Sequence, residues 1–168
     1  MIGEYDWTSD GAADFVTAAE ATSNVVGTMF WSLFPHADSH GFVEHDDGFT
    51  FHYPGDDPPM RAWAVAARKH AYAMRGAGPP PPLRAPPLAP RVTAANATHV
   101  SWAGAPLAAN YSVALDGRVV CDRCATDRQT PLRIAGGVKA GASIVVTGYG
   151  VDGRAGPPSE AWRMRRRE

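Results

Sequence analysis

The chain has 168 residues, a formal net charge of −1 and an apolar content of 45%. This length fits one domain or two small ones, and the apolar content excludes a chain that is disordered throughout. The balanced charge argues against a nucleic-acid-binding or membrane-surface protein, because both need an excess of basic residues. No apolar run reaches the ~18 residues that a membrane span needs.

The first part of the chain predicts a strand, a helix and a second strand. Met1 to Trp7 has the pattern of the end of a strand, and a helix follows over residues 12–22, with Ser9 or Asp10 as its N-cap. Residues 25–34 then form a continuous apolar run. Such a run is typical of a parallel strand that is covered on both faces.

A second helix follows a long loop and has clear boundaries. Asp57 is expected to cap it, two prolines occupy its first turn, and Gly76 ends it. Its apolar face recurs at helical spacing, at Met60, Trp63, Ala67, His70 or Ala71, and Met74. The order βαβα predicts a parallel α/β unit. Two strands and two helices are too few to bury a core, so we expect these residues to be the last quarter of a larger fold.

The remainder of the chain predicts a linker and an all-β domain. Residues 76–90 are rich in proline, which favours an extended spacer. From residue 91 the apolar pattern has a period of two, and turn signals separate seven short segments. These predicted strands are residues 91–95, 99–103, 110–116, 118–121, 131–134, 143–149 and 160–164. Seven short strands in such a length predict a β-sandwich.

This C-terminal part resembles a fibronectin type III domain. The resemblance rests on Pro90, Trp102 in the second strand, Tyr111 in the third, residues 146–153, and Pro157-Pro158-Ser159. One departure is that the tyrosine of the family's corner is replaced near Ala142. The resemblance therefore predicts a fibronectin type III-like sandwich over residues 91–168.

The first 75 residues resemble a retaining glycoside hydrolase of family 5. The match rests on Ile2-Gly-Glu-Tyr-Asp-Trp7, then a helix, then Gly27-Thr-Met-Phe-Trp-Ser-Leu-Phe34. The continuation from Gly41 to Asp56 is similar to fungal endo-β-mannanase-type members. The resemblance implies that residues 1–75 are the last two βα units of a (β/α)8 TIM barrel. It also implies a polysaccharide substrate, most plausibly β-1,4-mannan or another β-glycan, and no cofactor.

The same resemblance implies roles for individual residues. Glu4 would be the nucleophile, and Trp31 would stack on a sugar ring. Other groove residues would be Tyr5, Trp7, His36, His40 and His52. The family's acid/base glutamate lies on an earlier strand that this sequence does not include, so we expect very weak hydrolysis, or none, by this chain alone. Without the resemblance, Glu4 would be a solvated strand-end carboxylate and Trp31 a core residue.

A metal site is the rival interpretation of the histidine-rich loop. His36 and His40 are four residues apart with Asp38 between them, a spacing that suits zinc on a helix. Here the residues lie in a loop without a clear third ligand, so we predict no metal.

Three further features bear on where the parent protein acts. The N-terminus lacks a signal-peptide pattern, but two of the three asparagines, Asn96 and Asn110, lie in glycosylation sequons. Cys121 and Cys124 form a single CxxC beside a predicted hairpin, which leaves a small disulfide or two plain thiols as alternatives. Together these features favour a secreted parent enzyme.

We therefore expect a fragment of a secreted, retaining glycoside hydrolase joined to a β-sandwich. The alternative is a non-catalytic carbohydrate-binding or adhesion protein in which the sandwich is the working module.

Overall fold

The structure is a computed structural model that describes residues 2–37, 43, 47–55, 57–82, 86–127 and 130–164. The chain divides into two compact units. The first comprises Met1–Phe34 and Glu44–Arg84, and the second comprises Pro35–Val43 and Ala85–Glu168. The segment Pro35–Val43 thus interrupts the first unit in the sequence but belongs to the second.

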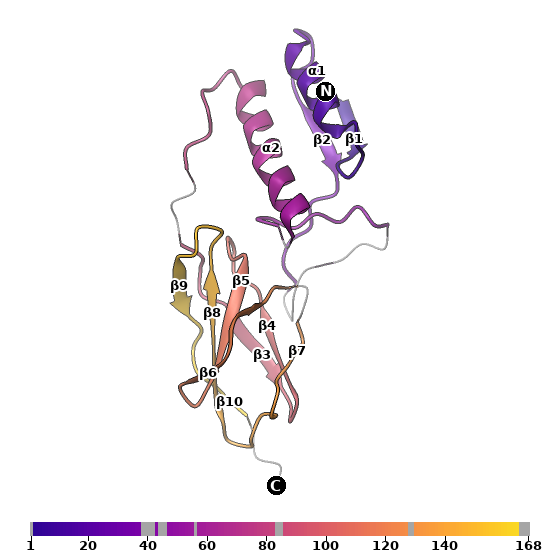
Figure 1. The fold of residues 1–168 in the computed structure, drawn as a ribbon. Coiled ribbons are helices and arrows are strands. Elements are labelled where there is room, and N and C mark those ends of the chain that lie inside the picture. Colours follow the sequence, from indigo (N-terminus) through magenta and orange to yellow (C-terminus); the bar gives the residue numbers. More distant parts are fainter. Residues whose placement is uncertain are drawn as a thin grey trace. The chain divides into compact units, whose positions relative to one another are not determined.

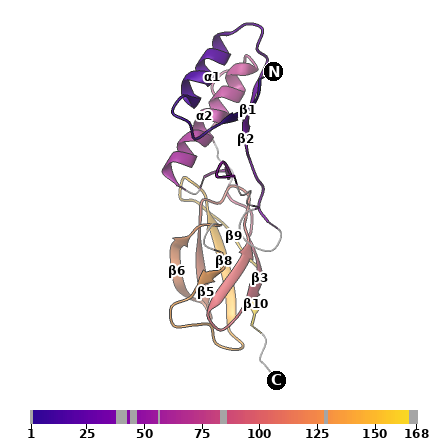
Figure 2. The same cartoon turned by 90° about the vertical axis from the view of Figure 1, so that its right-hand side faces the viewer.

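The first unit is a parallel β-α-β unit with a second helix, in the order that the sequence predicts. It comprises β1 (Ile2–Asp6), α1 (Ala12–Ala21), β2 (Thr28–Trp31) and α2 (Pro58–Met74), and the helices lie side by side (Figures 1 and 2). β1 and β2 pair in parallel, with Tyr5 opposite Phe30 and Asp6 opposite Trp31. The pairing shifts register between Ile2 and Tyr5, which is the mark of a β-bulge.

β2 is shorter than the predicted strand, and the prediction that both its faces are covered is wrong. After Trp31 the backbone leaves β1 and bonds to a later loop. Ser32 donates its N–H to Phe49 O (3.1 Å) and accepts from Phe51 N–H (2.8 Å). Within β2 the burial alternates, with Thr28 and Phe30 half-buried and Met29 and Trp31 exposed. A long-range pairing that the apolar run does not encode therefore ends the strand.

The two helices differ in their N-terminal capping. The predicted cap of α1 is wrong, because Gly11 occupies the N-cap position and no side chain bonds there; Ser9 instead accepts from Ala12 N–H through its carbonyl (3.0 Å). The predicted cap of α2 is confirmed: Asp57 Oδ1 accepts from Met60 N–H at 2.8 Å. Helix α2 begins with the two prolines and ends at Met74.

Aromatic rings fill the space between the two strands and the helices. The ring of Trp63 from α2 lies against Tyr5 (centroids 6.2 Å apart) and Phe30 (5.8 Å), both edge-on. Phe30 also packs edge-on against Phe51, whose side chain is only 2% exposed. Edge-to-face packing of this kind is favourable beyond the area it buries. One face of the β1–β2 pair is thus covered by helices.

The second unit consists of two antiparallel sheets. One has the order β3-β4-β7, and the other has the order β10-β8-β5-β6 with β9 paired to β8 (Figure 1). The strands are β3 (Arg91–Ala95), β4 (His99–Ala103), β5 (Asn110–Leu115), β6 (Arg118–Ala125), β7 (Leu132–Arg133), β8 (Ser143–Tyr149), β9 (Ala155–Pro158) and β10 (Trp162–Arg163).

β5, β7 and β10 are shorter than predicted, and two other strands, β6 and β9, differ from the sequence prediction in a more informative way. β6 runs to Ala125 instead of Cys121, because a shift in register lets Tyr111 pair with Ala125 after Val113 pairs with Cys121. β9 includes the prolines that predict a turn. It pairs only with β8, through Pro158 opposite Thr147, and proline is tolerated in such edge strands.

The core of the second unit lies between its two sheets. Val100 and Trp102 of β4 lie in one core cluster with Tyr111 and Val113 of β5 and with Ile144 and Val146 of β8, and all of these side chains are fully buried. Alternation along each strand places every second side chain in this core. The predictions that Trp102 lies in the second strand of this unit, β4, and Tyr111 in the third, β5, are both confirmed. No helix among the residues that the structure describes is long and apolar enough to cross a membrane.

Candidate functional site

Glu4 and Trp31 lie near the carboxyl ends of two adjacent parallel strands. Trp31 is the last residue of β2 and pairs with Asp6, the last residue of β1, and Glu4 precedes Asp6 by two residues. Both Glu4 and Trp31 are solvent-exposed. The carboxyl ends of parallel strands are where α/β enzymes place their sites.

The backbone at Glu4 is in an unusual conformation. Its φ is +48°, in the left-handed region that residues with a side chain rarely adopt, and it lies within the β-bulge of β1. A left-handed conformation costs an L-residue roughly 1–2 kcal/mol. Bulges beside active sites commonly redirect a side chain, and strain of this kind concentrates at such sites.

The indole of Trp31 is held by a loop that returns to the end of β2. Trp31 Nε1 donates to Asp47 Oδ2 at 2.5 Å, and Asp47 Oδ1 accepts from Phe49 N–H at 2.9 Å. The peptide bond between Trp31 and Ser32 is cis. The indole is 39% exposed, so it can offer part of its surface to a ligand while Asp47 fixes its orientation.

Tyr5 and Trp7 lie in the packing of the first unit. The ring of Tyr5 lies 4.6 Å from that of Phe15 and is half-buried. Trp7 stacks on Trp63 with centroids 6.5 Å apart, and its Nε1 donates to Phe49 O at 2.7 Å. These contacts give both side chains a structural role, and their predicted contact with sugar stays a prediction.

The three histidines predicted to line the groove have different surroundings. His52 is fully buried in the first unit, and its backbone N–H points to Met60 Sδ at 3.3 Å. His36 belongs to the second unit, where Nε2 lies 3.0 Å from Asp127 Oδ2. His40 lies outside the described residues. His52 and His36 thus belong to different units, and their predicted contact with sugar stays a prediction.

Among the residues that the structure describes, no three His, Cys, Asp or Glu side chains come together as the ligands of a metal ion would. Of the loop residues considered as zinc ligands, Asp38 and His40 lie outside this part.

A polar chain inside the first unit was not predicted. Glu20 Oε1 lies 2.8 Å from His70 Nδ1, and His70 Nε2 lies 2.8 Å from Thr28 Oγ1. Thr28 Oγ1 in turn lies 3.3 Å from the hydroxyl of Tyr5. The only sequence signal for this polar chain is the helical spacing that places His70 on the buried face of α2. The chain ties the residue next to Glu4 to both helices.

In the second unit, Cys121 and Cys124 are joined by a disulfide, with Cα atoms 5.4 Å apart. The two sequon asparagines differ in access. Asn96 is exposed at the β3–β4 turn, where its Oδ1 accepts from the N–H groups of Thr98 and His99, each at 2.9 Å. Asn110 is half-buried, and its Oδ1 is buried without a hydrogen-bond partner. The geometry favours Asn96 as a glycan acceptor.

The chain was also compared with known proteins. No protein-family model matches the sequence, and no curated protein matches it either.

Proposed function

We propose that the first unit is the C-terminal part of a family 5-like retaining glycoside hydrolase barrel that acts on a β-linked polysaccharide, most plausibly β-1,4-mannan. Glu4 is the nucleophile and Trp31 is the surface on which a sugar ring stacks. The observation that carries the proposal is the placement of Glu4 and Trp31 near the carboxyl ends of paired parallel strands. The acid/base carboxyl group would come from another strand of a complete barrel.

The chemistry of retention explains why these residue types are needed. One carboxylate attacks the anomeric carbon while a second carboxyl group, about 5–5.5 Å away, protonates the leaving oxygen. An exposed Glu4, two residues before the end of β1 and at the register shift of that strand, is accessible to a substrate. An indole held at one edge by Asp47 offers its face to the C–H groups of a pyranose.

The uncovered face of the β1–β2 pair supports a larger barrel. Phe30 packs towards the helices, whereas Met29, its neighbour in β2, is 54% exposed. Gly3 lies beside Met29 on this face, since an added Cβ there would be 3.7 Å from Met29 Cε. Parallel strands are normally covered on both faces. In a complete barrel, further strands would cover Met29 and extend the face that carries Trp31.

The second unit is proposed to be a fibronectin type III-like sandwich that accompanies the enzyme. Its support is the division into a three-stranded sheet and a larger sheet around one core that contains Trp102 and Tyr111. The disulfide and the exposed Asn96 favour secretion of the parent protein.

The test uses a protein in which this chain is joined to the barrel strands that complete it. We expect hydrolysis of mannan in preference to cellulose, and covalent labelling of the Glu4 peptide by a 2-fluoro mannoside. Glu4→Gln should remove both activity and labelling, whereas Asp10→Asn, an exposed acid shortly after β1, should leave both unchanged. Retained activity in Glu4→Gln would refute the nucleophile assignment.

Trp31 is tested separately by binding. Trp31→Ala should weaken mannan-oligosaccharide binding by about tenfold, the effect of losing one stacking contact. Trp102→Phe, a change in the second unit, is the control. Binding that persists in Glu4→Gln and is lost only on removal of the second unit would favour the non-catalytic alternative.

A further inference from the structure

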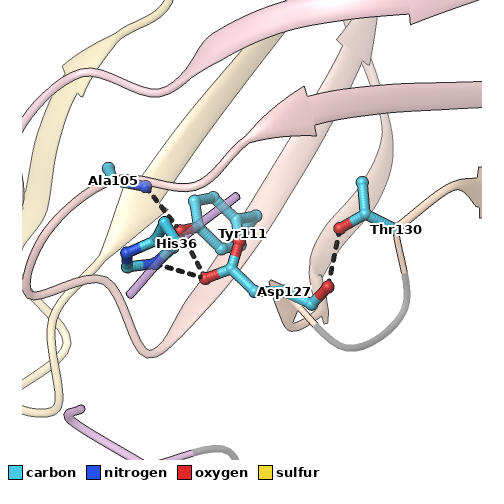
Figure 3. Close-up of polar contacts among 5 residues, drawn as sticks. All are labelled: His36, Ala105, Tyr111, Asp127 and Thr130. Atoms are coloured by element: carbon cyan, nitrogen blue, oxygen red, sulfur yellow. Dashed lines mark hydrogen bonds and ion pairs between the residues drawn. The ribbon is translucent and has the colours of Figure 1, made fainter. Parts of the chain in front are cut away.

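Asp127 is a buried carboxylate two residues after the end of β6. It is 3% exposed, and its Oδ2 accepts from the Tyr111 hydroxyl at 2.9 Å and lies 3.0 Å from His36 Nε2 (Figure 3). Thr130 donates its hydroxyl to the carbonyl of Asp127 at 2.9 Å. The carboxylate is thus fixed from both its side chain and its backbone.

The donor in the hydrogen bond between Tyr111 and Asp127 is determined by the other contact of the Tyr111 hydroxyl. The Tyr111 hydroxyl accepts from Ala105 N–H at 2.8 Å, so its own proton is directed to Asp127. Oδ2 thus accepts from the Tyr111 hydroxyl, and it also lies within hydrogen-bonding distance of Nε2 of His36.

Because Asp127 is buried, its carboxyl group needs polar partners within the protein, and the imidazole of His36 is one of them. Its other oxygen, Oδ1, is buried and has no hydrogen-bond partner. A buried carboxylate is unfavourable unless it is paired, because it loses its hydration. Among the residues that the structure describes, His36 is the basic group paired with Asp127.

Gly104 makes room for this pairing. A Cβ at position 104 would overlap the His36 ring and also Asp127 Oδ1. The ring therefore lies directly on the backbone of the turn after β4. Any larger residue at position 104 would displace either the imidazole or the carboxylate.

The imidazole comes from a distant part of the sequence. His36 is 91 residues away from Asp127 and lies in the segment Pro35–Val43, which follows β2. Val43 N–H bonds to Pro35 O at 3.0 Å, so the two ends of this segment are held together.

We propose that Asp127, Tyr111 and Gly104 form a receptor for the imidazole of His36, and that this latch fixes the chain at His36 to the second unit. This inference does not depend on the reaction proposed for the first unit.

The test is amide hydrogen exchange of the whole chain, followed by mass spectrometry. His36→Ala and Asp127→Asn should each speed exchange in peptides covering residues 33–43 by about tenfold or more, since a buried hydrogen bond to a charged group is lost. Exchange in β5 and β8 should be unchanged in His36→Ala. The matched controls are His99→Gln and Asp122→Asn, which alter a half-buried histidine at the start of β4 and an exposed acid of β6.

The double variant tests the pairing itself. If His36 and Asp127 act as a latch, His36→Ala combined with Asp127→Asn should exchange no faster than the faster single variant. Gly104→Ala should reproduce the faster exchange of the segment. Unchanged exchange of residues 33–43 in His36→Ala would overturn the proposal. If Asp127→Asn or Gly104→Ala unfolds the sheets, His36→Ala still decides, because it removes only the inserted ring.

Discussion

The hydroxyl of Thr28 lies 2.8 Å from Nε2 of His70, and this contact joins β2 to α2 inside the first unit. His70 is 7% exposed, and its other ring nitrogen is bonded to Glu20 of α1. Through the hydroxyl of Tyr5, the same chain reaches β1. One polar chain thus connects all four elements of the unit.

Removing the hydroxyl of Thr28 should destabilise the first unit. Thr28→Val keeps the shape of the side chain but leaves His70 Nε2 and the Tyr5 hydroxyl without this partner, at a cost of about 1–3 kcal/mol. Urea unfolding monitored by tryptophan fluorescence measures the change. Thr17→Val is the control, because its hydroxyl bonds only to the backbone of Ala13 on an exposed helix face (2.9 Å). An equal effect of both substitutions would show that the buried chain adds no stability.

The left-handed backbone of Glu4 predicts a gain in stability on substitution by glycine. Glu4→Gly removes the clash of Cβ with the backbone and should raise the free energy of unfolding by up to about 1 kcal/mol. Glu4→Ala retains Cβ and should give no gain, so it is the matched control. Thermal unfolding of the two variants provides the comparison. A lower stability of Glu4→Gly than of Glu4→Ala would argue against strain at this position.

The caps of the two helices should respond differently to loss of an aspartate. Asp57→Ala removes the acceptor for Met60 N–H and should cost about 1 kcal/mol. Asp10→Ala should cost less than about 0.5 kcal/mol, because no side chain caps α1. Circular dichroism during urea unfolding measures both. A larger loss of stability for Asp10→Ala would mean that the side chain of Asp10 caps α1.

The phenol of Tyr53 should ionise late in an alkaline titration. Burial raises its pKa above the usual value of 10.0, and the positive charge of Arg68 opposes this rise. The folded state holds the proton more tightly, so the stability this provides is present below pH 10.0 and is lost as the pH rises through the folded-state pKa. Near-ultraviolet phenolate absorbance should show a late step that Tyr53→Phe removes. Arg68→Gln should move this step to still higher pH, and a step that moves lower would contradict the charge effect.

The local sequence pattern predicted those helices and strands whose boundaries do not depend on the segments they pair with. The bounds of β3, β4 and β8 follow the period of two, and α2 follows its proline and aspartate start. β2 and β9 could not be predicted in this way. β2 ends because Ser32 pairs with Phe49 and Phe51, and β9 forms because β8 offers it an edge. Both boundaries depend on contacts between segments that are separate in the sequence.

The same limit applies to the candidate site. The sequence pattern predicted strands around Glu4 and Trp31 with a helix between them, and β1 and β2 are these strands, paired in parallel. The roles that the resemblance implies for Glu4 and Trp31 stay predictions. The partner of His36 could not be predicted, because Asp127 lies 91 residues later and no repeated spacing links the two. The same holds for the contact between Thr28 and His70, which depends on how α2 packs against β2.

The uncovered face of the β1–β2 pair should affect the association state of this chain in solution. Met29 and Trp31 expose apolar surface on the face of the strand pair that a neighbouring layer would normally cover. Leu33, two residues after Trp31, is 58% exposed. Exposed apolar patches promote self-association. Scattering measurements across a dilution series should therefore show particles that shrink as the protein is diluted, and Met29→Lys should shift the preparation towards single chains.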